Sequence, residues 1–248
     1  MIDNSHPITK LANLRDLGGV SSDYGDLRSG LLYRSDDVAN IDQAQLAELL
    51  DLGLGMVIDF RSKAEAEAVG RGPLAAEAVD YLHLPVLDFI GEDHNVGQED
   101  LMQEFTNEML GTWYSEVLHK AAPMISEGIA AVAEHSGPVL FHCAIGKDRT
   151  GIFASSIYSL LGVSESDIVR DFSKTDDNLP KILARLAHSQ PFWTEGTMRA
   201  TGALMRAQPE AMQTMLRLVQ ERSGSVAEVL LANGVSESTR QKLVAKLH

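Results

Sequence analysis

The feature that most constrains the fold is a short apolar run that leads directly into a turn around the only cysteine of the chain. Residues 138–142 read PVLFH and predict a buried strand, and the next nine residues read CAIGKDRTG. Residues 150–161 are rich in apolar side chains and predict a helix that ends at Gly162, since glycine is favoured just after a helix. This order of strand, turn and helix places Cys143 at the end of a strand in an α/β fold.

The rest of the chain alternates short apolar runs with longer amphipathic ones, as an α/β fold requires. Further strands are predicted at residues 31–34, 55–60 and 81–86. Helices are predicted at residues 41–50, over residues 99–135 with breaks near Gly111 and Pro123, and from a cap at Ser164 with Asp167.

No internal repeat and no linker-like segment divides the 248 residues, so we expect one domain over residues 1–248. Everything after residue 179 has a helical pattern, in pieces separated by Pro180, Pro191, Pro209 and Gly234. Residues 179–207 are expected to form a helical excursion from that domain. Within it, residues 190–193 (QPFW) with Met198 and Met205 form either a mobile apolar lid over the cysteine turn or ordinary helix packing.

Charge and hydropathy restrict the partners. The 35 acidic residues outnumber the 21 basic ones, and the net charge of −14 argues against nucleic acid and against long-range attraction of anions. Any anion site must be built locally. No run approaches the roughly 18–20 apolar residues of a membrane span, and the N-terminus has no signal-peptide pattern. We therefore expect no integral membrane segment and a cytoplasmic protein, with export by a route that uses no cleaved signal as the alternative.

The cysteine turn has the parts of such a local anion site. Its successive N–H groups can point at one anion, Gly146 permits the backbone conformation this needs, and the helix start adds partial positive charge. The Arg149 guanidinium can bind two phosphate oxygens at once. The predicted phosphate-binding residues are Ala144, Ile145, Gly146, Lys147, Asp148 and Arg149.

Cys143 is the predicted nucleophile at this site. The positive surroundings favour its thiolate, and Arg149 is placed to stabilise the equatorial oxygens as a phosphoryl group passes to sulfur. The Thr150 hydroxyl can donate to the sulfur and help it leave in the hydrolysis step. A lone cysteine excludes an internal disulfide, and the histidines lack metal-ligand spacing, so we expect no metal and no cofactor.

The pattern of Cys143, five residues, Arg149 and Thr150 resembles the signature of the protein tyrosine phosphatase superfamily. The fuller string HCAIGKDRTG resembles that of a bacterial and fungal tyrosine phosphatase group that includes secreted virulence phosphatases. Segments 13–19 (NLRDLGG), 32–36 (LYRSD) and 58–65 (IDFRSKAE) agree with that group in the same order. The resemblance implies a tyrosine phosphatase fold, with a central, mostly parallel sheet flanked by helices.

The same resemblance implies the reaction and its substrates. Members hydrolyse phosphate monoesters through a phosphocysteine intermediate and release inorganic phosphate. They act on phosphotyrosine proteins, in some cases on phosphoserine or phosphothreonine, and often on phosphoinositide headgroups, with which a loop lysine such as Lys147 is associated. A catalytically silent phosphate-binding adaptor is the alternative from a different class.

Cleavage also needs an acid that protonates the leaving oxygen. The resemblance implies Asp148, and Asp88, just after the strand at 81–86, is the other candidate by position. Asp16, Arg61 and His142 are expected to support the loop from behind, the histidine by hydrogen bonding to backbone. Structural ion pairs are expected of most of their neighbours in the matching segments, which are Arg15, Arg34, Asp59 and Glu65.

Overall fold

The computed structural model describes residues 10–90, 106–189 and 202–248. Its central sheet has the strand order β1-β4-β7-β5-β6. β7 runs parallel to both β4 and β5, β6 runs parallel to β5, and β1 is antiparallel to β4. The predicted α/β fold with a mostly parallel sheet is confirmed. The strands are β1 (Arg15–Asp16), β4 (Leu32–Ser35), β5 (Met56–Asp59), β6 (Asp80–His83) and β7 (Val139–His142).

The helices of the described residues follow the predicted alternation with strands. A two-stranded hairpin of β2 (Ser21–Ser22) and β3 (Gly25–Asp26) stands apart from the main sheet. The α-helices are α1 (Gln43–Asp51), α2 (Lys63–Val69), α3 (Val86–Ile90), α4 (Asn107–Glu134), α5 (Asp148–Leu160), α6 (Glu165–Ser189), α8 (Pro209–Ser223), α9 (Val226–Ala232) and α10 (Glu237–Leu247). Two 3-10 helices are η1 (Gly72–Ala76) and η4 (Gly202–Met205).

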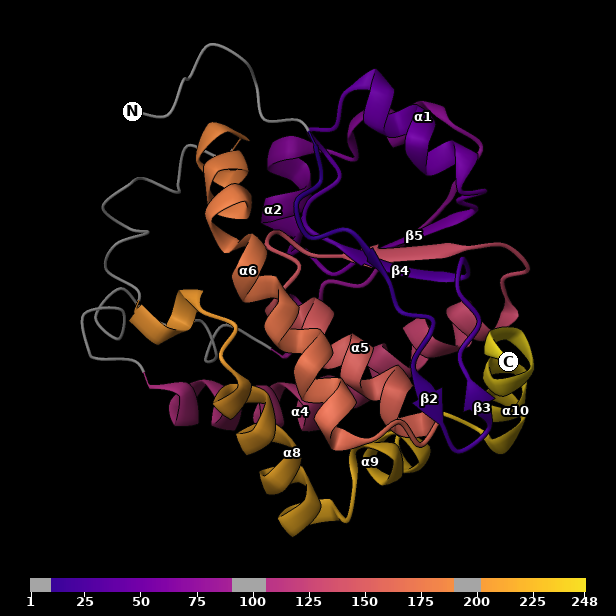
Figure 1. Ribbon diagram of the computed structural model, residues 1–248, viewed down its shortest axis with the longest axis vertical. Helices are drawn as coiled ribbons and strands as arrows, with labels where there is room; N and C mark the ends of the chain where they lie inside the picture. The colour runs from indigo at the N-terminus through magenta and orange to yellow at the C-terminus, as the bar shows by residue number, and fades with distance from the viewer. Residues whose placement is uncertain (1–9, 91–105, 190–201) are drawn as a thin grey trace.

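Both faces of the sheet are covered by helices, which explains why β7 is apolar without alternation. Side chains alternate along a strand, so Leu140 packs on one face with Leu46 of α1. Val139 and Phe141 pack on the other face, in the main core with α4 and α5. Figure 1 shows α1 on one side of β4 and β5, and α4 and α5 on the other.

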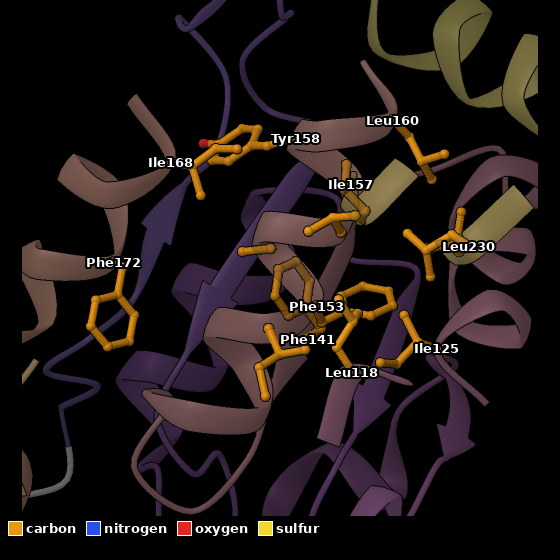
Figure 2. Close-up of a cluster of buried hydrophobic side chains, with 14 of the residues drawn as sticks. Leu118, Ile125, Phe141, Phe153, Ile157, Tyr158, Leu160, Ile168, Phe172 and Leu230 are labelled. Carbon is orange, nitrogen blue, oxygen red and sulfur yellow. The ribbon is translucent and has the colours of Figure 1, made fainter. Parts of the chain in front are cut away.

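The main core lies between β7, α4 and α5. Figure 2 shows Phe141 and Phe153 at its centre, with Leu118 and Ile125 of α4 beside them. The rings of Phe141 and Phe153 meet edge to face with centroids 4.9 Å apart. Because this packing fixes both β7 and α5, it also fixes the two ends of the loop that joins them.

The expected breaks near Gly111 and Pro123 are wrong, because both residues lie inside the continuous helix α4. Gly111 is there for close packing: a Cβ at this position would lie 2.4 Å from the Ala211 carbonyl oxygen of α8. Pro123 lies on the exposed side of the helix, which continues through it without the hydrogen bond that a proline cannot donate.

Pro180 likewise does not separate two helices, since α6 continues through it to Ser189 and the proline is exposed. Pro209 and Gly234 do stand at boundaries, the first at the start of α8 and the second between α9 and α10. The lid residues predicted at 190–193 and Met198 lie outside the described residues. Among the described residues, none of the helices combines the length and the apolar composition that crossing a membrane demands.

Candidate active site

The Cys143 loop lies where three parallel strands end together. His142, the last residue of β7, is in register with Ser35 of β4 and Asp59 of β5, which are also the last residues of their strands. Carboxyl ends of neighbouring parallel strands form the usual ligand-binding edge of an open α/β sheet. The loop is tied to its neighbours there, since Asp37 donates its N–H to the Ala144 carbonyl at 3.2 Å.

Cys143 is 1% exposed, and its sulfur accepts the N–H of Gly146 at 3.3 Å across the loop. Gly146 has φ of +73°, and a Cβ there would lie 2.2 Å from the Ser35 carbonyl oxygen. Only glycine fits both the backbone conformation and the close approach of β4. The expected role of Gly146 therefore has a steric reason as well as a conformational one.

Side chains outside the loop hold its carbonyls. Asn13 Nδ2 and Arg34 Nη2 donate to the Gly146 carbonyl at 3.0 and 2.9 Å. Arg34 is fully buried and is held in turn by Asp171 of α6, with Nη1 and Oδ2 2.6 Å apart. Because these contacts hold the carbonyl on the outside of the loop, the N–H of the same peptide, that of Lys147, points to the opposite side.

Arg149, in the first turn of α5, forms a two-pronged ion pair with Glu65 in the first turn of α2. Its Nη1 donates to Oε2 at 2.5 Å and to the Phe60 carbonyl at 3.1 Å, and Nη2 donates to Oε1 at 3.1 Å. Although burial acts to raise the pKa of Glu65, Arg149 lowers that pKa to about 2. Glu65 also completes a capping box with Ser62, so the start of α2 and the orientation of Arg149 depend on one carboxylate.

Lys147 and Asp148 meet a residue that the sequence did not reveal, Tyr114 in the middle of α4. The Tyr114 hydroxyl donates to Asp148 Oδ1 at 2.5 Å and accepts from Lys147 Nζ at 3.1 Å. Lys147 Nζ also lies 2.5 Å from Asp148 Oδ1, and both Lys147 and Tyr114 have no exposed surface. The expected positive charge in the loop is therefore present, but it is paired with its neighbour.

Behind the loop, His142 links Cys143 to a buried charge cluster. Its Nδ1 lies 3.1 Å from the Cys143 carbonyl, and its Nε2 lies 3.8 Å from Asp59 Oδ1. Arg61 binds Asp59 and Asp37, with shortest distances of 2.6 and 3.1 Å. Burial acts to raise the pKa of Asp59, but His142 and Arg61 hold it well below its ordinary value. The cluster fixes the ends of β4 and β5 beneath the loop.

A sequence model of the tyrosine phosphatase family matches residues 6–248 of this chain, which is nearly its whole length. The chain belongs to the tyrosine phosphatase family. It is therefore a hydrolase.

Curated relatives of this phosphatase agree with that assignment. The triple specificity protein phosphatase PtpB of Mycobacterium tuberculosis is 25% identical over 93% of this chain and 94% of its own length. A putative tyrosine-protein phosphatase of Cupriavidus necator is 32% identical over 71% of this chain and 66% of its own. A tyrosine-protein phosphatase of Nostoc commune is 28% identical over 86% and 73%.

Among solved structures, Pseudomonas aeruginosa TpbA in complex with pTyr covers 70% of this phosphatase and 86% of its own chain. The identity is 22% and the TM-score is 0.32, so this likeness adds nothing to the family assignment.

Three more of the predicted site residues are Thr150, Asp88 and Asp16. The Thr150 hydroxyl is buried and has no hydrogen-bond partner within the described part of the chain. Asp88 is exposed and accepts the Lys63 N–H at 2.8 Å, at the start of α2. Asp16 accepts the N–H groups of Gly18 and Gly30 at 2.7 and 2.5 Å, so its carboxylate closes the turn-rich segment before β4.

Helix α6 covers the first part of the loop. Ala144 and Ile145 belong to a small apolar cluster whose other buried members come from α6 and η4, namely Leu179, Ile182, Leu186 and Met205. Met205, predicted as lid material, thus packs in the same cluster as two loop residues. Over residues 10–90, 106–189 and 202–248, no group of three or more His, Cys, Asp or Glu side chains is placed to hold a metal ion. His94 lies outside these ranges.

Proposed function

We propose that this phosphatase hydrolyses phosphate monoesters in two steps through a phosphocysteine on Cys143. In the first step the thiolate attacks phosphorus, and the P–O bond to the leaving group breaks. In the second step water attacks phosphorus, the P–S bond breaks, and inorganic phosphate leaves with the thiolate restored. The observation that carries the proposal is the buried Cys143 sulfur facing the Gly146 N–H, in a loop closed by the clamped guanidinium of Arg149.

We assign the proton transfers to Asp148. Its protonated carboxyl gives a proton to the leaving oxygen in the first step, and its carboxylate takes a proton from water in the second. The side chain is partly exposed beside the loop, whereas Asp88 is engaged with the backbone N–H of Lys63. Thr150 is assigned to the departing thiolate, because its buried hydroxyl follows Arg149 and has no other partner within the described residues.

The substrates proposed are phosphotyrosine proteins, with some breadth toward other phosphoesters. The breadth is supported by the relative PtpB, which is named a triple specificity phosphatase. Phosphoinositide headgroups are the second candidate, and Lys147 is the residue that favours them. A silent adaptor is disfavoured, because the nucleophile, the arginine and the acid are all present in the loop.

The test compares hydrolysis of a phosphotyrosine peptide, a phosphoserine peptide and a soluble phosphoinositide by wild type, Cys143→Ser, Asp148→Asn and Asp88→Asn. We expect no turnover by Cys143→Ser, and a loss on the order of 10²-fold by Asp148→Asn. Asp88→Asn should retain wild-type turnover, because an amide oxygen still accepts the Lys63 N–H. Turnover by Cys143→Ser at the wild-type rate would reject the covalent mechanism, and a defect confined to Asp88→Asn would move the acid to Asp88.

A further inference from the structure

A tyrosine on a distant helix touches the residue assigned as the acid. Tyr114 belongs to α4, whereas Asp148 begins α5, and the Tyr114 hydroxyl lies 2.5 Å from Asp148 Oδ1. We infer that Tyr114 is a positioning residue for Asp148: it fixes Oδ1 so that Oδ2 carries the proton to the leaving group. The inference rests on the proposed role of Asp148 as the acid.

The Tyr114 ring is held firmly enough to define a position. It has no exposed surface, and it meets Phe172 of α6 edge to face with centroids 5.9 Å apart. Phe172 in turn lies against Gly151, where a Cβ would be 3.0 Å from its ring. The ring of Trp113 also packs against the Tyr114 ring, with centroids 5.7 Å apart. The hydroxyl is therefore fixed by the packing of α4, α5 and α6.

The hydrogen bonds at Asp148 distinguish its two oxygens. Oδ1 accepts from both the Tyr114 hydroxyl and the Lys147 ammonium, each at 2.5 Å. No bond from Oδ2 is present among the described residues. An oxygen that already accepts two hydrogen bonds is the poorer site for a proton, so the acidic hydrogen belongs on Oδ2. If Oδ1 and Oδ2 accepted the same number of hydrogen bonds, the proton would lie on either oxygen and point in either of two directions.

Tyr114 also moderates the pairing of Lys147 with Asp148. The Lys147 ammonium donates to Asp148 Oδ1 at 2.5 Å. The Tyr114 oxygen accepts from Lys147 Nζ at 3.1 Å and so takes part of that interaction. Burial and the nearby Asp148 raise the pKa of Tyr114 well above its ordinary value, so the phenol remains a donor at working pH.

The competing explanation is that Tyr114 only packs in the core. If Tyr114 only packs in the core, its replacement lowers stability, but the resulting loss of activity does not depend on the leaving group. Loss of acid catalysis does depend on it, because a phenol of high pKa leaves poorly without a proton whereas a phenol of low pKa leaves as the anion.

The experiment measures kcat/KM for a series of aryl phosphates whose leaving phenols span low to high pKa. Wild type, Tyr114→Phe, Asp148→Asn and Tyr158→Phe are compared. Tyr158 is the matched control, a buried tyrosine of α5 whose hydroxyl donates to the Leu17 carbonyl at 3.0 Å. We expect Tyr114→Phe to lose about 10-fold with the poorest leaving groups and less than about 3-fold with the best, in the direction of Asp148→Asn.

Equal losses by Tyr114→Phe across the series, as in Tyr158→Phe, would overturn the inference while leaving Asp148 as the acid. A flat series for Asp148→Asn would instead reject Asp148 itself, and the inference with it. If Tyr114→Phe does not fold, site-specific replacement of Tyr114 by 3-fluorotyrosine keeps the ring and the hydroxyl but makes it a stronger donor. That protein should show a leaving-group dependence that differs from wild type, and an unchanged dependence would overturn the inference.

Discussion

Glu65 holds the guanidinium of Arg149 through two hydrogen bonds, between Oε2 and Nη1 at 2.5 Å and between Oε1 and Nη2 at 3.1 Å. The two residues lie in the first turns of different helices, α2 and α5, so the pair joins the end of β5 to the end of β7. A side chain held at both nitrogens has little rotamer freedom left to lose when phosphate binds.

Replacing Glu65 by glutamine should lower the free energy of unfolding by about 3 kcal/mol at pH 7, because the pKa of Glu65 falls from 4.5 to about 2 on folding. A depressed pKa contributes stability that is fully present above pH 4.5 and is lost as pH falls toward about 2. The difference between variant and wild type should therefore shrink to roughly half at pH 3. Urea unfolding across this range measures it.

The control for that series is Glu67→Gln, since Glu67 lies on the same helix and is exposed. It should change stability by less than about 0.5 kcal/mol at every pH. A Glu65→Gln difference that stayed constant from pH 7 to pH 3 would mean that the ion pair does not set the pH dependence.

Replacing Gly146 by alanine should abolish the binding of vanadate, a phosphate analogue, to the Cys143 loop. It should also reduce turnover by more than about 100-fold. The new Cβ would meet the Ser35 carbonyl oxygen at 2.2 Å, and the positive φ adds a cost on the order of 1 kcal/mol. Gly70→Ala is the matched control, because Gly70 has φ of +69° but nothing within 4 Å of a Cβ. It carries the conformational cost without the collision, so it should bind vanadate normally in a calorimetric titration.

Replacing Gly111 by alanine should destabilise the protein, although alanine usually stabilises a helix by about 1 kcal/mol relative to glycine. The reason is the Ala211 carbonyl oxygen of α8, only 2.4 Å from the new Cβ. At Gly128 in the same helix the nearest atoms are side-chain carbons of Phe153 and Leu84, at 2.8 and 3.0 Å. Thermal unfolding should show a larger loss for Gly111→Ala than for Gly128→Ala, and the reverse order would contradict the close α4–α8 contact.

Replacing Arg34 by lysine should lower both the stability of the protein and the affinity of the Cys143 loop for vanadate. A lysine cannot bond Asp171 and the Gly146 carbonyl at the same time in the geometry of a guanidinium. We expect a loss of about 2–4 kcal/mol in stability and weaker vanadate binding. Arg15→Lys is the comparison, since Arg15 pairs with the same Asp171 but does not donate to the loop. Equal effects of both changes on vanadate binding would show that the bond to Gly146 is unimportant.

The strand and the loop could be predicted because their signals are local. Residues 138–142 are apolar and are bounded by proline and by the cysteine turn, and Ser164 caps α6 with Asp167 as expected. The breaks predicted at Gly111 and Pro123 failed for a physical reason: both depend on what surrounds the helix, a close neighbour in one case and open solvent in the other. Local propensity carries neither piece of information.

Tyr114 could not be predicted for the same kind of reason. It stands in an amphipathic helix among other core residues, and only the packing of α4 against α5 and α6 brings its hydroxyl to Asp148. Lys147 was expected to add positive charge beside the phosphate, and its pairing with Tyr114 and Asp148 was not visible either. The hydrogen bonds that Asp88 and Asp16 accept from the N–H groups of Lys63 and Gly30 also depend on the folded chain, since each joins distant positions in the sequence.

The central place of β7 has a consequence for the nascent chain. β4 and β5 leave a gap between them that β7 fills, although β7 is the last of the five strands to be synthesised. β4 and β5 therefore cannot take their final places in the sheet before residues 139–142 emerge from the ribosome. Glu65, which holds Arg149, precedes that strand in the chain, and Asp171, which holds Arg34, follows it. The loop around Cys143 is therefore completed late in biosynthesis, because α6 and η4, which cover it, follow β7 in the chain.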